Sequence, residues 1–320
     1  MRAAAAFFKS RRALFMLRAS VTTVVTSALL ALTSFLNAAV TARGLGVDGR
    51  GTLAAALLVV AVGRVLGLMG LGDAVVRAFG QQQVLSSVRR VLVGVLAIAA
   101  LAGLTIGMLG VSITPLRGEG WPLLLMVVLW TGLGAMLDLL IAIARVQPSL
   151  SIFNFIRLAA PTLATSVTAL VYFIDGLTVA VVLLVQVVTT VFSMVWATHS
   201  LSRVLKDSVL LEERPKNVDI SLRGLARAGA GYQWIAMLGL VVTHGHLGIV
   251  MTVGSLHALG LYSAVFGLSR MIAPVQMSIG SAVFAASAQD LGSSSASGTL
   301  RAYRLSTALM LSIGVCVAAN

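Results

Sequence analysis

The sequence has few charged residues and only one cysteine. Asp, Glu, Lys and Arg make up 10% of the 320 residues, against roughly 25% in ordinary soluble domains, which excludes a soluble globular protein. Apolar residues make up 58% of the chain and its mean hydropathy is +1.01, so most of it is expected to lie in lipid. The single cysteine, Cys316, stands in an apolar run, which excludes a disulfide framework and a thiol metal site.

The sequence also lacks the short motifs of common enzymes. It contains no HExxH, P-loop, GxSxG or CxxC pattern, and nothing in it calls for a cofactor. A membrane-bound glycosyltransferase or polymerase is the enzyme alternative, and it would need an acidic pair in an outer loop or at a membrane edge. The acids of the expected outer loops, Asp48, Glu119 and Asp175, are widely separated. The sequence therefore favours a protein that is not an enzyme.

Long apolar runs without a polar alternation predict membrane-spanning helices rather than the strands of a barrel. We expect an all-α polytopic membrane protein with about nine spans. The spans fall at 19–40, 52–71, 91–113, 122–144, 158–174, 177–198, 231–253, 260–286 and 305–320. The last one is short for a hydrocarbon layer of about 30 Å, so the sequence is expected to be cut off inside a helix.

Basic residues collect on one side of this topology. With the N-terminus inside, eighteen of the 23 Lys and Arg residues, Arg145 and Arg157 among them, fall on the cytoplasmic side. The other five are Arg43, Arg50 and Arg117 in outer loops and Arg64 and Arg270 within spans. Because positively charged loops stay in the cytoplasm, we predict a multi-pass protein of the cell membrane with a cytoplasmic N-terminus. The net charge of +13 then reflects topology, and no nucleic-acid partner is expected.

The N-terminal segment and the longest polar stretch both allow two interpretations. The basic start MRAAAAFFKSRRALFMLR fits a secretory signal or a transit peptide, but an uncleaved first helix is simpler, because the apolar run after it is long and opens the series of spans. The polar stretch divides the chain into a six-helix bundle at 1–198, a cytoplasmic linker at 199–230 and an incomplete bundle at 231–320. Within the linker, Leu201, Val204 and Leu205 suit a short helix on the inner membrane surface, and a plain solvated linker is the alternative.

Two motif-like patterns carry little chemistry in this context. Gly44, Gly46 and Gly49 satisfy GxGxxG, but a membrane helix precedes them where a nucleotide-binding fold needs a strand, so we predict a tight turn. His244 and His246 are about 200° apart around a helix and cannot hold one metal ion together, so no metal site is expected. His246 stays a candidate for a proton relay or coupling-ion site in the seventh span.

Two arginines lie where a charge is costly. Arg64 and Arg270 stand inside spans, and each costs at least about 2.5 to 3.5 kcal/mol there unless it faces water or a partner. Two guanidinium groups that line one internal cavity could bind a phosphate, because their planar fork matches anionic oxygens. The alternative is a structural arginine that bonds helix carbonyls or pairs with Asp138 or Asp73.

Polar side chains support a hydrated interior near these arginines. Thr26, Thr33 and Asn37 share one face of the first span, and Ser263 shares a face with Arg270 in the eighth. We predict that these residues contact the cargo, although such hydroxyls often bond only their own helix. Asp138, in the fourth span, is a candidate coupling-ion site, or an acid paired with a neighbouring arginine.

Two stretches resemble bacterial polysaccharide flippases of the multidrug, oligosaccharidyl-lipid and polysaccharide exporter superfamily. VTARGLGVDGRGTLAAALLVVAVGRVLGLMGLGDAVVRAFG, at 40–80, resembles the first helix-loop-helix of that family. LGLYSAVFGLSRMIAPVQMSIGSAVFAASAQ, at 259–289, resembles its eighth helix. The resemblance implies two related six-helix bundles around a central cavity, with Gly51 and Gly260 opening corresponding helices.

The resemblance also implies a function. Members of this family move lipid-diphosphate-linked sugars to the outer leaflet by alternating access, so our first hypothesis is a flippase for a lipid-linked oligosaccharide or polysaccharide precursor. Arg64 and Arg270 would hold the diphosphate. The expected partners are that glycan, membrane lipid and polysaccharide assembly proteins. The alternatives are a cation-coupled drug exporter of the same superfamily and a nontransporting, truncated membrane scaffold.

Overall fold

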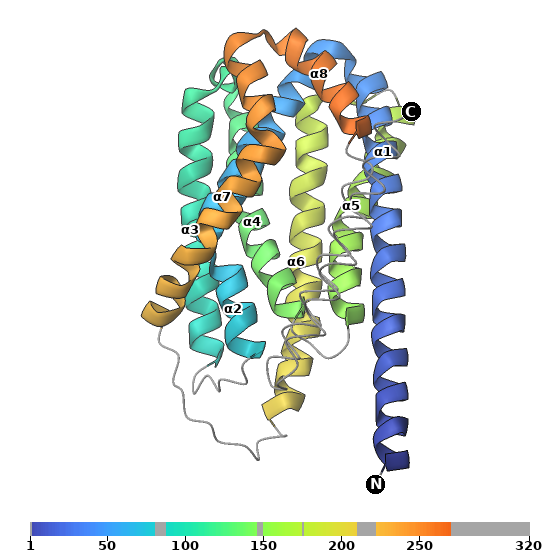
Figure 1. The fold of residues 1–320 in the computed structure, drawn as a ribbon. Coiled ribbons are helices and arrows are strands. Elements are labelled where there is room, and N and C mark those ends of the chain that lie inside the picture. The colour runs from blue at the N-terminus through green and yellow to red at the C-terminus, as the bar shows by residue number, and fades with distance from the viewer. Residues whose placement is uncertain (1, 81–87, 146–149, 175, 210–221, 270–320) are drawn as a thin grey trace.

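The protein is an elongated assembly of helices, seen here in a computed structural model. The structure describes residues 2–80, 88–145, 150–174, 176–209 and 222–269. Its helices are α1 (Arg2–Leu68), α2 (Leu71–Gly80), α3 (Val88–Ile113), the short 3₁₀ helix η1 (Pro115–Gly118), α4 (Trp121–Arg145), α5 (Leu150–Phe173), α6 (Val179–Val209), α7 (Leu222–Val253) and α8 (Leu256–Ser269). The N-terminus and α2 lie at one end of the bundle, and α8 passes over α1 at the other end (Figure 1).

Helix α1 is a hairpin of two helical arms. Only Gly46 departs from helical geometry within it, with φ 66° and ψ −173°, in a region that suits glycine because a Cβ atom is absent. We call residues 2–45 the first arm and residues 47–68 the second arm. The expected spans 19–40 and 52–71 therefore both lie in α1, and the predicted tight turn at GLGVDG is reduced to one non-helical residue.

The remaining helices confirm the polytopic all-α fold. Six helices in the described part of the chain are long and apolar enough to cross a membrane, the first of them holding both arms of α1. Many of their large apolar side chains face outward, such as Leu101 at 65% and Val242 at 78% exposed, as expected where lipid is the surrounding solvent. The eighth expected span is described only as far as 269, and the ninth, at 305–320, lies outside the described residues.

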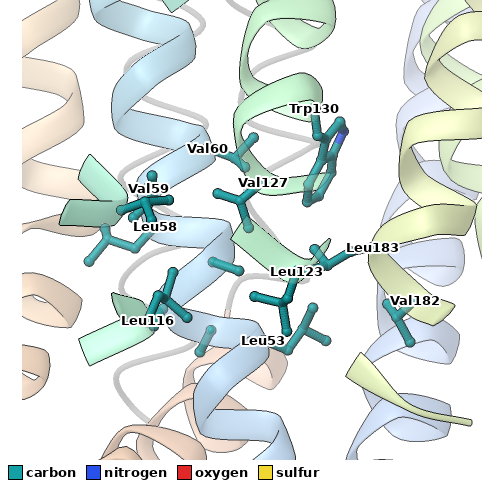
Figure 2. Close-up of a cluster of buried hydrophobic side chains, with 14 of the residues drawn as sticks. Leu53, Leu58, Val59, Val60, Leu116, Leu123, Val127, Trp130, Val182 and Leu183 are labelled. Carbon is teal, nitrogen blue, oxygen red and sulfur yellow. The ribbon is translucent and has the colours of Figure 1, made fainter. Parts of the chain in front are cut away.

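Two apolar clusters hold the helices together. One joins the second arm of α1, α3, η1, α4, α6, α7 and α8, and includes Leu53, Leu116, Val127 and Leu183 (Figure 2). The other joins α2, α3, α4, α5, α6 and α7 nearer the N-terminal end of the bundle. Close packing of such side chains replaces the hydrophobic effect as the attraction between helices in lipid.

Three boundaries differ from the sequence prediction, and each places polar or basic residues in a helix. Helix α6 continues to Val209, so Leu201, at 3% exposed, packs in the core instead of starting a helix on the membrane surface. Helix α5 begins at Leu150, which puts Arg157 inside it rather than in a loop. The short helix α2, absent from the predicted spans, follows Gly70 at φ 68° and buries Leu71.

Glycines allow the first part of the chain to cross α7 and α8 at close range. A Cβ atom on Gly51 would collide with the Leu256 carbonyl, and one on Gly260 would collide with the Val47 carbonyl. At the other end of the second arm, Gly70 and the backbone of Gly229 meet in the same way. Small residues at such crossings let backbones approach in a membrane. Whether the chain divides into bundles at 1–198 and 231–320 stays a prediction.

Candidate functional site

An ion pair between Arg64 and Asp138 lies at the centre of the candidate site. Nε of Arg64 donates to Oδ2 of Asp138 at 2.8 Å, and Nη2 donates to Oδ1 at 2.5 Å. This is the two-pronged geometry in which a guanidinium fork matches a carboxylate. The two side chains are 28% and 29% exposed. In this conformation the cost of Arg64 in the bilayer is offset by a partner on α4, which is the alternative that the sequence analysis raised.

Small residues on α1 and α4 make room for this pair. A Cβ atom on Gly134 would lie 2.7 Å from Cδ of Arg64, so the arginine side chain lies across a glycine of the facing helix. One turn along the contact, Gly63 leaves the same space for Thr131. Because both glycines face a large side chain, the second arm of α1 and α4 pack closely enough for Arg64 to reach Asp138.

Further charges surround the pair on neighbouring helices. Arg145 ends α4 seven residues after Asp138, on the same helix face, and its charge interacts with those of Asp138 and of Asp73 on α2. Arg157 of α5 lies near Arg145, since both guanidinium carbons are within 5.5 Å of the Phe153 ring centroid, so the two positive charges oppose each other. Among the described residues linked by these contacts, Arg64, Arg145 and Arg157 outnumber Asp73 and Asp138, so the cluster carries a positive surplus.

The predicted hydroxyl residues mostly bond their own helix. Thr26 donates to the Thr22 carbonyl at 2.8 Å, Thr33 to Leu29 at 2.7 Å and Ser263 to Gly260 at 3.0 Å. Among the described residues no hydrogen bond joins any of them to Arg64. The Thr33 carbonyl also accepts from Thr165 of α5 at 3.4 Å, which places this part of the polar face against α5.

Two predicted residues carry buried polar atoms that have no hydrogen-bond partner in the described part of the chain. Oδ1 of Asn37 and Nε2 of His246 are both of this kind. The His246 ring packs edge-on against Phe266 at 4.2 Å and Tyr262 at 5.7 Å between ring centroids. Arg270 lies outside the described residues, so its role beside Arg64 stays a prediction.

The structure adds two polar contacts that the sequence analysis missed. Arg50, expected in an outer loop, is a helical residue that is 8% exposed and donates to the Thr41 hydroxyl. His257 pairs with Asp48, with Nδ1 and Oδ1 2.9 Å apart. The pattern of charges in the sequence did not indicate either contact, because each depends on how the α1 hairpin folds back on itself and on α8.

Nothing in the described part of the chain brings three or more His, Cys, Asp or Glu residues together in a way that could hold a metal ion. The chemistry available at the site is therefore that of guanidinium groups, carboxylates, hydroxyls and aromatic rings. Guanidinium groups match anionic oxygens, and aromatic faces attract cations.

Comparison with solved structures places this fold among transporters. The structure of a MATE multidrug transporter, DinF-BH, solved in complex with a ligand, superposes with a TM-score of 0.65 at 15% identity, over 94% of this chain and 71% of that one. A second MATE, also solved as a complex, gives 0.60 at 14%, over 95% and 72%. A MOP superfamily transporter from Pyrococcus furiosus, whose binding pocket is described as having reverse polarity, gives 0.62 at 15%, over 95% and 70%. The chain has the fold of these MATE and MOP superfamily transporters.

No protein-family model matches the sequence, and no curated protein matches it. These structural neighbours are transporters and not enzymes. At these identities the likeness extends to the fold, and the cargo has to be argued from the residues of this chain.

Proposed function

We propose that this protein is a membrane transporter that moves a lipid-linked oligosaccharide or polysaccharide precursor from the inner to the outer leaflet. The observation that carries the proposal is the positive surplus, among the described residues, of the cluster that contains the Arg64–Asp138 pair, Arg145 and Arg157. Arg64, Arg145 and Arg157 outnumber Asp73 and Asp138 there, which favours a cargo with phosphate groups over a cationic drug.

The Arg64–Asp138 pair suggests how cargo binding and ion coupling meet at one site. A guanidinium fork that holds a carboxylate can hold a phosphate with the same two N–H groups. A cargo diphosphate that took over Arg64 would leave Asp138 without its cation, and an isolated carboxylate in a membrane takes up a proton or another cation instead. Arg64 would thus bind the cargo and Asp138 would bind the coupling ion, as the sequence analysis expected.

Transport by three variants distinguishes two roles for the Arg64–Asp138 pair. In one, the cargo phosphate replaces Asp138 on Arg64; in the other, the pair is purely structural. We would reconstitute the wild type, Arg64→Gln, Asp138→Asn and the double variant in liposomes, and measure flipping of a lipid-diphosphate oligosaccharide. Cargo binding by Arg64 predicts that Arg64→Gln and the double variant both lose flipping by at least about tenfold. A structural pair predicts instead that the double variant regains activity, since it contains no unpaired charge, and that result would remove Arg64 from the proposed site.

The matched control for this experiment is Arg227→Gln. Arg227 is exposed on α7, so its replacement removes the same charge from an unburied position, and within the described residues Arg227 forms no ion pair. We expect the control to flip cargo like the wild type. Equal amounts of each variant in the membrane, measured by quantitative blotting, ensure that the comparison reports transport and not insertion.

A cation-coupled drug exporter is the second candidate, and the aromatic cluster on α7 and α8 favours it. Tyr262 and Phe266 are stacked, with ring centroids 6.1 Å apart and an interplanar angle of 7°, beside His246. Flat cationic compounds bind to such aromatic faces. Efflux of a cationic dye from the same liposomes, lost in Tyr262→Ala and unaffected by Arg64→Gln, would support this candidate over the flippase.

The remaining expectations about the protein follow from the proposed transport. The lipid-linked glycan would be its substrate, and polysaccharide assembly proteins would be its partners in the membrane. A cytoplasmic N-terminus would place α2 and the charge cluster at the inner leaflet, where such a cargo is made available.

A further inference from the structure

Two arginines near the ends of α4 and α5 share one phenylalanine. The guanidinium carbon of Arg145 lies 5.5 Å from the centroid of the Phe153 ring, and that of Arg157 lies 5.0 Å from it. Phe153 itself is only 1% exposed, so the ring is a fixed part of the core. A cation above an aromatic face is stabilised by the ring quadrupole, but one ring cannot neutralise two positive charges.

Both arginines keep buried hydrogen-bond donors that are unused. Nε of Arg145 and Nη1 of Arg157 are buried and make no hydrogen bond to any described residue. A buried donor without an acceptor costs about 1 to 3 kcal/mol, and more when the group is charged. Two such donors beside the same ring therefore indicate that an acceptor with negative charge belongs there.

The acids that the structure describes near these arginines do not supply that negative charge. Asp138 is held by Arg64 through both of its oxygens. Asp73 interacts with Arg145 through its charge, but within the described part of the chain it forms no ion pair with either arginine. Arg157 is opposed by Arg145 and forms no ion pair with an acid in the ranges that the structure covers.

The position of the two arginines suits a phosphate at the membrane boundary. Arg145 is the last residue of α4, and Arg157 lies seven residues after the start of α5, about 10 Å along the helix. The same end of the bundle carries the N-terminus and α2 (Figure 1). The ends of membrane-spanning helices lie near the lipid head groups, and basic pockets between transmembrane helices bind such head groups.

We propose that Arg145 and Arg157 form a phosphate-binding site between α4 and α5. Its ligand is a phosphate group, either in the head group of an anionic lipid or in a soluble phosphoanion. Nε of Arg145 and Nη1 of Arg157 donate to the phosphate oxygens, while Phe153 keeps the two guanidinium planes in place. The site lies beside the Arg64–Asp138 pair and shares Arg145 and Arg157 with the positive surplus on which the proposed function rests, but its test measures ligand binding and not transport.

Thermal unfolding of the purified full chain tests this site without measuring transport. The protein is placed in nanodiscs of phosphatidylcholine alone or with one fifth phosphatidylglycerol, and pyrophosphate is added to the first kind in a separate arm. A ligand that binds only the folded protein raises the Tm. We expect the wild type to gain stability in at least one arm, and Arg157→Gln and Arg145→Gln to lose that gain. A gain with phosphatidylglycerol assigns the ligand to a lipid head group, and a gain with pyrophosphate assigns it to a soluble anion.

The Tm in pure phosphatidylcholine, whose head group carries a phosphate but no net negative charge, distinguishes a binding site for an anion from a structural role. If Arg145 and Arg157 form a binding site for an anion, either Gln variant removes one of two positive charges that repel each other. The Tm of that variant in pure phosphatidylcholine should then equal or exceed that of the wild type. Arg227→Gln is the control, and it should respond to each ligand like the wild type. Retention of the full ligand-induced shift by both Arg145→Gln and Arg157→Gln, or the absence of any shift in the wild type, would overturn the proposal.

Ligand affinity can also be measured directly, and this measurement includes one further variant, Arg157→Lys. Binding of the active ligand, followed by native mass spectrometry or calorimetry, should weaken by at least about tenfold in Arg157→Gln. Arg157→Lys keeps the positive charge but loses the planar guanidinium fork, so its affinity for the ligand should lie between those of the wild type and Arg157→Gln. Equal binding by Lys and Gln at this position would also contradict the proposed contacts.

Discussion

Gly51 and Gly260 face each other where α1 crosses α8, and each leaves room for the backbone of the other helix. Asp48 and His257 pair beside them and are 209 residues apart, and Gly51 and Gly260 have the same separation. Each glycine also follows a break in the helices, at Gly46 and between α7 and α8. The two crossing helices thus meet at glycines that each follow a helix break, and whether they belong to two related halves stays a prediction.

The crossing should not tolerate even one methyl group. In Gly51→Ala the new Cβ would collide with the Leu256 carbonyl, and overpacking of this kind costs about 1 to 3 kcal/mol. We expect a lower Tm in detergent for Gly51→Ala. Gly231→Ala is the matched control, because a Cβ there meets nothing within 4 Å and the helix gains propensity. Equal Tm values for the two variants would contradict the close approach.

The contact between Asp48 and His257 should contribute little to stability. The two side chains are 82% and 58% exposed, and exposed pairs are worth about 0 to 1 kcal/mol and are screened by salt. We therefore expect His257→Gln to change the free energy of unfolding by less than about 1 kcal/mol, and to make no difference at high salt. A large loss that persists at 1 M salt (roughly a 3 Å screening length) would show that His257 has a further role.

Stability should depend on both members of the Arg64–Asp138 pair together. Replacement of one member by an apolar residue leaves a charge in the bilayer without its partner, which costs up to about 3 to 5 kcal/mol for a fully buried pair and less at this partial exposure. We expect Arg64→Met and Asp138→Leu each to lower the Tm and the double variant to recover most of it. Additive losses in this double-mutant cycle would argue that the two groups act independently.

Asn37 and Thr33 should respond differently to apolar replacement. The Thr33 hydroxyl donates to its own helix, so Thr33→Val should change stability by less than about 0.5 kcal/mol. Oδ1 of Asn37 is buried without a partner among the described residues, so Asn37→Leu should keep or raise the Tm because it removes that atom. If Asn37 serves the cargo, Asn37→Leu should also reduce flipping while Thr33→Val does not. Full flipping in Asn37→Leu would remove it from the site.

Hydropathy predicted the helices well because in a bilayer every backbone amide must be satisfied within its own segment. The spans in α3, α4 and α6 begin and end within a few residues of the expected bounds, apart from the extension of α6 to Val209. Hydropathy does not predict helix α2, because α2 is too short to span a membrane. It predicts a loop at Arg50, because this residue lies between the apolar runs at 19–40 and 52–71. The bend at Gly46 needs only one residue, so the helix continues through the rest of that segment.

The sequence predicted individual residues of the candidate site, but not which of them contact one another. An arginine in a span must find water or a partner, so Arg64 was a candidate from the sequence, and Asp138 was among its alternative partners. The sequence did not decide between phosphate and carboxylate, because either group fits the guanidinium fork. Arg145 and Arg157 were hidden among the basic residues that set topology, since no local pattern shows that two of them share Phe153.

The amino-acid sequence by itself determined that this is a polytopic helical membrane protein with costly charges in its spans, because the requirement to bury backbone and side chains in lipid acts on each segment separately. The tertiary structure decided which charges meet: the pairing of Arg64 with Asp138, the opposition of Arg145 and Arg157, and the crossing at Gly51 and Gly260. These contacts depend on which helices lie side by side and at what depth. Packing between segments that are distant in sequence sets both, and hydropathy contains no information about it.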